Sequence, residues 1–239
     1  MRFTYADYQN LICLLREKEY SICSYHNWNN TSRCAILRHD VDIDLNKAVR
    51  LAEFEAQLEV KSTYFILLTS NFYNPASKTC LNQIRTIQSM GHEIGLHFDE
   101  RVYPDKGTEE TIKHILKERD ILSSILGVPV ITVSMHRPSQ ATLDANLEIA
   151  GMVNSYGRIF FRQFKYVSDS RCRWREPVLD IVESGSYDKL HILTHAFWYD
   201  ESEKDVTDTV KSFLNSAYKV RYEQMKENIT DLDEILMDH

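Results

Sequence analysis

The sequence predicts one α/β domain built around a parallel barrel, and three observations predict it. Short apolar, β-branched segments alternate along the chain with longer segments that carry apolar residues at helical spacing. This alternation is typical of parallel βαβ units. About six or seven such strands fit into 239 residues, with no repeat, low-complexity tract or Pro/Gly/Ser-rich linker between them. A closed or nearly closed barrel suits a single domain of this length.

Each helix is predicted from its apolar spacing and from the residues at its ends. Thr4 can cap a first helix that reaches about Lys18, Asp44 opens a second, and Gly91 and Gly127 stop two others. The expected helices cover residues 4–18, 44–58, 81–90, 109–126 and 205–225. We expect one domain over residues 1–239, with a helix and turn in residues 1–33 and a C-terminal helical segment in residues 203–239.

The expected strands are short and rich in β-branched and apolar residues. They cover residues 35–39, 62–67, 93–97, 130–135, 166–168 and 190–195. The segments 148–153, 159–164 and 166–168 are harder to assign, and we treat the last as a strand that ends at Asp169.

Composition excludes some classes of protein. The net charge is −7, from 28 basic and 35 acidic residues, and no dense block of Lys and Arg is present. We therefore expect no nucleic-acid partner, because such proteins neutralise phosphates with clustered positive charge. No run approaches the roughly 18 apolar residues of a membrane span, so no transmembrane segment is expected.

The N-terminal residues and the cysteines predict a cytoplasmic location. The first residues lack the apolar core of a secretory signal. The five cysteines are odd in number and scattered, which favours free thiols in a reducing compartment over disulfides or a zinc knuckle. They are Cys13, Cys23, Cys34, Cys80 and Cys172.

Chemically active side chains follow the predicted strands, at the point where each strand ends. In parallel barrels the functional residues lie at the carboxyl ends of the strands, so these side chains should meet at one rim. Carboxylates and histidines there suit a metal or a general base, as a hydrolase requires. The residues, in chain order, are Asp40, Asp42, His97, His136, Arg137, Asp169 and His195.

These motifs resemble those of the NodB-homology polysaccharide deacetylases, carbohydrate esterase family 4 (CE4). Residues 38–42, Arg-His-Asp-Val-Asp, look like a variant of the family's first motif, Thr-Phe-Asp-Asp. Residues 91–97, Gly-His-Glu-Ile-Gly-Leu-His, match the stretch that leads into its metal-binding His-x-x-x-His. Arg137-Pro138, residues 169–174 and Leu-Thr-His at 193–195 resemble the third, fourth and fifth motifs. The resemblance covers residues 34–198.

The resemblance implies a distorted α/β barrel of about seven parallel strands that removes N- or O-acetyl groups from carbohydrates. It implies one divalent metal, expected to be zinc, held by one Asp and two His. In these terms Asp40 is the general base, Asp42 and His97 are ligands, and His195 is the general acid. The exchange of roles between Asp40 and Asp42 stays open, because Val41 separates them.

One position departs from the family pattern. The second metal histidine would fall four residues after His97, where this chain has Arg101. His136 can replace it from the neighbouring strand end, Asp99 can replace it with a harder oxygen ligand, or the metal can be lost. We favour Asp42, His97 and His136, a set with open positions that suits zinc.

Four further residues are expected to bind substrate or support the site. Arg137 is expected to orient Asp40 or a substrate oxygen, although a structural ion pair explains it nearly as well. Asp169 is expected to orient His195, with a loop cap as the alternative. Trp174 and Trp198 are candidates for stacking on a sugar face, and core packing is at least as good an explanation for each.

The sequence therefore favours a metal-dependent hydrolase that removes an acyl group, acetyl as first choice, from an amino sugar or other small carbohydrate or glycan intermediate. A hydrolase of another C–N bond that uses the same fold without a metal is the alternative. A carbohydrate-binding protein without activity is a third. Two carboxylates and His195 argue against the third, since binding alone needs no acid/base pair.

Overall fold

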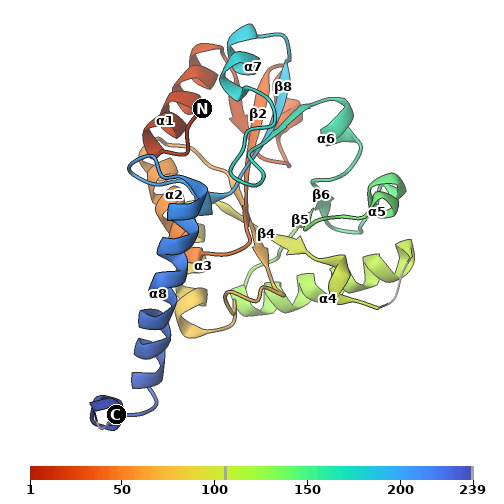
Figure 1. Cartoon of the computed structure of the whole chain (residues 1–239). Coiled ribbons are helices and arrows are strands. Elements are labelled where there is room, and N and C mark those ends of the chain that lie inside the picture. Colours follow the sequence, from red (N-terminus) through yellow and green to blue (C-terminus); the bar gives the residue numbers. More distant parts are fainter. Residues whose placement is uncertain (105–106, 238–239) are drawn as a thin grey trace. The chain divides into compact units, whose positions relative to one another are not determined.

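In the described part of the chain, residues 1–104 and 107–237, eight parallel strands form a single sheet (Figure 1). Seven strands of this computed structural model follow one another in the order β6-β5-β4-β3-β2-β8-β7, and β1 pairs with β2 beside this path. The sheet curls into a barrel that stays open between β6 and β7, which confirms the predicted distorted barrel. The strands are β1 (Ser21–Cys23), β2 (Cys34–Val41), β3 (Thr63–Leu67), β4 (Glu93–Phe98), β5 (Thr132–Met135), β6 (Val153–Asn154), β7 (Lys165–Ser168) and β8 (Lys189–Thr194).

The chain divides into two compact units, Met1–Glu201 and Ser202–His239, and helices of the first unit cover the outside of its sheet. The second unit holds α8 and α9, where Tyr222 and Lys226 both donate to Asp233. None of the described helices is long and apolar enough to cross a membrane. The helices are α1 (Tyr5–Glu17), α2 (Leu45–Gln57), α3 (Lys78–Ser89), α4 (Thr108–Leu126), α5 (Gln140–Ala145), α6 (Ile159–Arg162), α7 (Val178–Ser184), α8 (Val206–Lys226) and α9 (Leu232–Met237), with short 3₁₀ turns at Trp28–Asn30, Glu100–Val102 and Ala196–Trp198.

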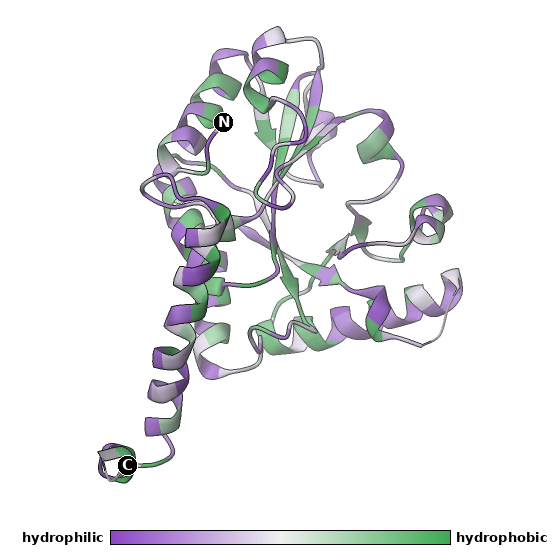
Figure 2. Ribbon diagram, viewed as in Figure 1, coloured by the Kyte–Doolittle hydropathy of each residue, from purple (hydrophilic) through white to green (hydrophobic). Residues whose placement is uncertain are grey.

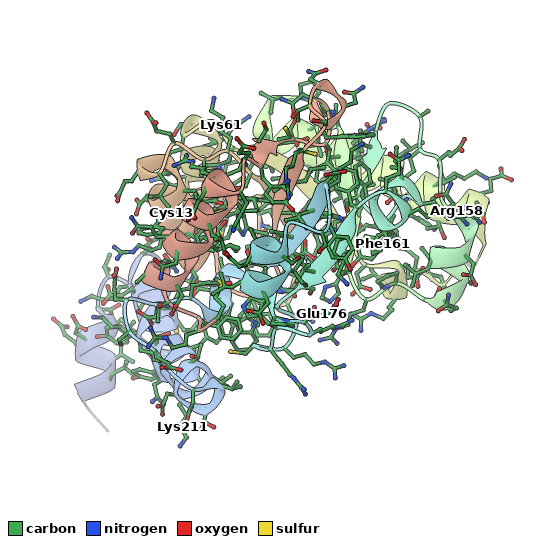
Figure 3. All side chains as sticks on the ribbon, turned by 90° about the horizontal axis from the view of Figure 1, so that it is seen from above. Cys13, Lys61, Arg158, Phe161, Glu176 and Lys211 are labelled. Carbon is green, nitrogen blue, oxygen red and sulfur yellow. The ribbon has the colours of Figure 1, made fainter. Side chains whose placement is uncertain are left out.

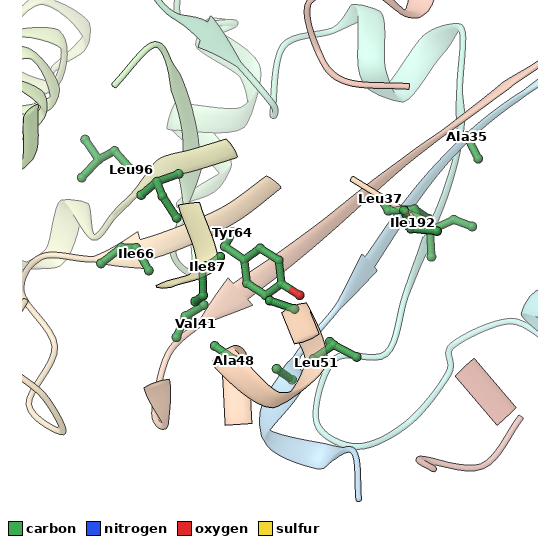
Figure 4. Packing of buried hydrophobic residues seen from close by; sticks show 14 of the residues in the cluster. Ala35, Leu37, Val41, Ala48, Leu51, Tyr64, Ile66, Ile87, Leu96 and Ile192 are labelled. Atoms are coloured by element: carbon green, nitrogen blue, oxygen red, sulfur yellow. The ribbon is translucent and has the colours of Figure 1, made fainter. Parts of the chain in front are cut away.

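The main core lies between the outer face of the sheet and the helices. Apolar residues fill the strands and the inward faces of the helices, whereas charged side chains such as Lys61 and Arg158 lie at the periphery (Figures 2 and 3). Figure 4 shows Leu37 of β2 beside Ile192 of β8, its partner in the parallel ladder, with Val41, Tyr64 and Leu51 in the same cluster. Burial of these side chains is the main stabilising contribution.

Side chains of β2 alternate between this outer core and the inside of the barrel, as the pleat requires. Leu37 and Val41 join the outer cluster, whereas Cys34 and Ile36 join a second cluster inside the barrel. All eight residues of β2 are buried, so its inward positions must accept buried polar groups wherever the sequence supplies them. Positions 38, 40 and 42 continue the inward series.

Gly95 of β4 makes room for the floor of the barrel interior. A Cβ at this position would lie 2.5 Å from Cε1 of Phe65, which crosses directly over the glycine. Phe65 in turn lies under the guanidinium of Arg38, 5.1 Å from the ring centre. The absence of a side chain at Gly95 therefore lets Phe65 lie across β4, and the polar part of the interior begins above the Phe65 ring.

A buried carboxylate ties the outer face of β2 to two helices. Glu55 of α2 is fully buried and accepts hydrogen bonds from Tyr8 (2.6 Å), Ser62 (2.6 Å), Tyr64 (2.8 Å) and His39 (3.0 Å). Burial alone would raise the pKa of Glu55, but the charge and hydrogen bond of His39 lower it to about 2. A buried anion with four donors is expected to stabilise the fold strongly.

Replacing Glu55 with glutamine is expected to lower the free energy of unfolding by about 2–3 kcal/mol at pH 7, because a charged acceptor is lost. The folded-state pKa lies below its ordinary value of 4.5, so this stability is present above pH 4.5 and declines towards pH 2. Urea unfolding between pH 7 and 3 should show a weaker decline in the variant. Glu53→Gln, an exposed change on the same helix, is the control; equal effects of both changes would contradict the prediction.

The predicted helices and strands are confirmed with shifts of a few residues at their ends. Three short elements were not anticipated: β1, α5 and α7. Of the segments that were hard to assign, 166–168 lies in β7, 159–164 contains α6, and 148–153 reaches β6 only at its last residue. All five cysteines are free thiols.

Candidate active site

Three side chains from the carboxyl ends of three strands bring one ligand atom each to a common point. His97 lies on β4, and Asp42 and His136 directly follow β2 and β5. Asp42 Oδ1 lies 3.2 Å from His97 Nε2 and 3.3 Å from His136 Nδ1, and the two ring nitrogens are 3.2 Å apart. Among the described residues this is the one group of its kind with all its ligand atoms within 4.8 Å of one another.

The triangle has the dimensions of a tetrahedral metal site. Metal–ligand distances of about 2.0–2.1 Å in a tetrahedron place the ligand atoms about 3.3–3.4 Å apart. Asp42 Oδ1 is buried and makes no well-formed hydrogen bond within the described residues. A buried carboxylate oxygen without a donor is costly unless a cation satisfies it. The residues present therefore fit a divalent metal.

Backbone contacts hold His136 where the triangle needs it. Its N–H donates to the carbonyl of Phe98 at 2.7 Å, which fixes the end of β5 against β4. Arg101, four residues after His97, turns onto Asp99, with Nε 2.8 Å from Oδ1 and Nη2 2.5 Å from Oδ2. Asp99 Oδ2 lies 4.0 Å from His136 Nε2, so its carboxylate approaches the outer side of that ring.

Asp40 lies beside the triangle and is held by Arg38, two residues earlier on the same strand. Arg38 Nη2 donates to both carboxylate oxygens, at 2.9 and 2.7 Å, and also to Ser134, while Nη1 donates to Ser155 at 2.9 Å. Asp40 Oδ2 is 3.7 Å from His97 Nε2. Burial alone would raise the pKa of Asp40, but the charge of Arg38 lowers it below its ordinary value.

His195 stands on the other side of Asp42, paired with a buried carboxylate. Its Nδ1–H donates to Asp169 Oδ1 at 2.6 Å, and its backbone N–H donates to Oδ2 at 3.0 Å. Nε2 is left facing the site, 3.9 Å from Asp42 Oδ2. Burial alone would lower the pKa of His195, but the charge and hydrogen bond of Asp169 raise it to about 9. Asp169 thus favours the protonated imidazole and orients its Nε2 towards the site.

Sequence reasoning expected Arg137 on Asp40, and the structure has Arg38 there instead. Arg137 is exposed and contacts neither Asp40 nor any other charged partner within the described residues. Its other expected contact, a substrate oxygen, stays a prediction. The signal that could have found Arg38 is its even spacing from Asp40, which puts both side chains on one face of a strand.

The two tryptophans expected at the site are half-buried. Both pack against the main core cluster, and the ring of Trp198 meets Phe197 edge-on with the centres 4.8 Å apart. Stacking on a sugar stays a prediction for both.

Comparisons with known proteins bear on the fold alone. Neither a protein-family model nor a curated protein matches the chain. A CE4 esterase from Streptococcus mutans superposes with a TM-score of 0.53 at 13% identity, over 88% of this chain and 91% of that one. The peptidoglycan deacetylase PdaC from Bacillus subtilis gives 0.45 at 14% identity, over 83% and 98%. A CE4 family pseudoenzyme from Bacillus anthracis gives 0.48 at 16% identity, over 79% and 62%.

Proposed function

We propose that this chain, which has the fold of the CE4 esterase, is a metal-dependent hydrolase that removes an acyl group, acetyl as first choice, from an amino sugar or other carbohydrate intermediate. The observation that carries the proposal is the triangle of Asp42, His97 and His136, with Asp40 and His195 on either side of it. A shared fold alone does not define a reaction, so the proposal depends on these side chains.

Asp42, His97 and His136 are the residues that would hold the metal, and zinc is the expected ion. When bound, such an ion polarises the acyl carbonyl and lowers the pKa of water. Three protein ligands suit catalysis better than a purely structural site, which usually has four. The triangle also favours Asp42 over Asp40 as the ligand, because Asp40 stands outside it.

Asp40 is the general base in this proposal. Its lowered pKa keeps it ionised at neutral pH, and the two hydrogen bonds from Arg38 fix the plane of its carboxylate. It takes a proton from the attacking water as the water oxygen bonds to the acyl carbon. Because both Asp40 oxygens already accept from Arg38, the carboxylate cannot rotate away from the site.

His195 is the general acid. Its Nε2 proton passes to the leaving nitrogen or oxygen as the bond from that atom to the acyl carbon breaks, which releases the sugar and a carboxylate. Asp169 stabilises the charged imidazole and holds its ring in one orientation. Acid/base catalysis requires that Asp40 is ionised and His195 is protonated at the same pH.

Acetate release from acetylated amino sugars tests the proposal. Protein purified without chelator is expected to carry about one divalent ion per chain, to release acetate, and to lose that activity with EDTA until metal is added back. Asp40→Asn should keep the metal and lose turnover, which separates base from ligand. Activity that ignores EDTA would favour a metal-independent hydrolase, and sugar binding without turnover would favour a binding protein.

A further inference from the structure

We propose that the substrate carries a phosphate or diphosphate group, and that three arginines, Arg137, Arg171 and Arg173, bind it. We call them the rim arginines. The inference rests on the proposed function, because it names the substrate class of the same site.

The rim arginines project from two strand ends that already supply the site. Arg137 directly follows His136, and Arg171 is two residues beyond Asp169. The backbone N–H of Arg173 donates to the carbonyl of Asp169 at 3.2 Å, so the loop after β7 stays close to the strand end. His136 and His195 each approach Asp42 to within 4 Å. Arg137 therefore begins one residue from a side chain of the triangle, and Arg171 and Arg173 begin two and four residues from the carboxylate that holds His195.

No protein group neutralises these arginines. All three are exposed, and none of their guanidinium groups has an ion pair or hydrogen bond within the described residues. Arg85, Arg162, Arg175 and Arg221 are likewise exposed and without such a contact within the described residues, but they do not directly follow a side chain of the site. Arg158, labelled in Figure 3, donates to the carbonyl of Asp144. Others pair with carboxylates, namely Arg2, Arg38, Arg50, Arg101 and Arg119.

The charge around the rim arginines is opposite in sign to that of the protein. Residues 170–175, the loop that carries two of them, contain three basic side chains and no acidic one, whereas the whole chain has a net charge of −7. A local positive field in an acidic protein attracts anions towards the place where it is concentrated. Neutral sugars gain nothing from such a field, so its position beside the site indicates an anionic ligand.

The backbone presents two of these arginines in an unusual conformation. In the described part of the chain, six residues other than glycine have positive φ, and three of them are Arg137 (49°), Arg171 (64°) and Cys172 (55°). The left-handed region is unfavourable for residues with a side chain. Conformations of this kind tend to collect at ligand sites, where the surroundings hold a side chain in place.

Guanidinium chemistry selects phosphate among the anions. Each guanidinium is planar and offers paired N–H donors that match two oxygens of one phosphate. Three of them exceed what a single sugar carboxylate can accept, whereas a diphosphate has enough oxygens and charge. Sugars carry diphosphates when they are linked to a nucleoside or to a prenyl lipid, and both sources share this chemistry.

Calorimetry on the protein as purified, carrying Asp40→Asn to prevent turnover, tests the inference. The probes are N-acetylglucosamine, its 1-phosphate, its uridine-diphosphate derivative and a short prenyl-diphosphate derivative. We expect the phosphorylated sugars to bind more tightly than the neutral one. Arg171→Ala/Arg173→Ala should weaken the phosphorylated probes by about 10- to 100-fold and leave the neutral sugar unchanged. The better of the two diphosphates identifies the source.

Arg162→Ala is the matched control. Arg162 is also exposed and unpaired within the described residues, but it ends α6 before β7 begins, next to Lys165 and Lys189 at the amino ends of strands. The Arg162→Ala variant should bind every probe as tightly as the Asp40→Asn protein without it. Thermal unfolding of all variants checks that they are folded.

The outcomes separate this inference from the proposed function. Equal binding of neutral and phosphorylated sugars, or an unchanged double variant, would overturn the inference and leave deacetylation intact. Phosphorylated sugars that bind through the rim arginines but release no acetate with the wild type would overturn the proposed function alone. Binding to anionic lipid vesicles without preference for a sugar, or tighter binding of an N-acetylated sugar carboxylate, would also overturn the inference.

Discussion

His136→Ala is expected to abolish metal binding and acetate release together. The change removes one of three ligand atoms that lie 3.2–3.3 Å apart and leaves two, with an opening to solvent where the ring was. Loss of an outer partner of a ligand typically costs 10- to 100-fold in affinity, and loss of a ligand itself should cost more than roughly 100-fold. Competition with a fluorescent zinc chelator measures the affinity without any need for turnover.

Arg101→Ala is the control for that experiment, because Arg101 lies four residues after His97, where the sequence resemblance would place a second histidine. It is expected to keep the metal, since its guanidinium is engaged with Asp99 and donates nothing to the triangle. Retention of metal by His136→Ala, with loss in Asp99→Asn, would instead make Asp99 the third ligand. If neither His136→Ala nor Asp99→Asn loses the metal, the proposed metal site is wrong.

Arg38→Met is expected to lower the free energy of unfolding by about 3–5 kcal/mol and to remove activity, because it leaves the buried carboxylate of Asp40 without its cation. Methionine keeps much of the length of the side chain, so the loss reports charge and hydrogen bonds more than volume. Burial would then dominate at Asp40 and raise its pKa, so the loss should be largest at neutral pH and smaller in acid. Chemical unfolding at pH 5 and pH 8 measures both effects.

The double variant Arg38→Met/Asp40→Asn provides the control. With no unpaired charge left inside the barrel, it should regain part of the lost stability while remaining inactive. A double variant as unstable as Arg38→Met would mean that the packing of the guanidinium between Phe65 and Tyr156 matters more than its charge.

The sequence was sufficient for the barrel and for most of the candidate site, and the reason is positional. Asp40, Asp42, His97, His136 and His195 each follow an apolar run that reads as a strand, and parallel strands bring such ends together. No contact with a partner had to be known to expect them at one rim. The same reasoning proposed His136 where Arg101 cannot serve.

What the sequence could not indicate depends on contacts between distant segments. The pairing of Arg38 with Asp40 was within reach of the strand spacing, but its hydrogen bonds to Ser134 and Ser155, about a hundred residues away, were not. Arg171 and Arg173 are separated by Cys172 and do not form a dense basic block. Short helices such as α5 and α7 have too few turns for a helical period to stand out.

Because the barrel is open between β6 and β7, Arg38 also has a structural role. No ladder of backbone hydrogen bonds fixes the circumference of the barrel there. Arg38 donates from β2 to Ser134 on β5 and to Ser155 just beyond β6. Its side chain therefore links strands on two sides of the open barrel. Any widening of the seam that moves Ser155 pulls on the same guanidinium that orients Asp40. The orientation of the Asp40 carboxylate therefore depends on the width of the barrel.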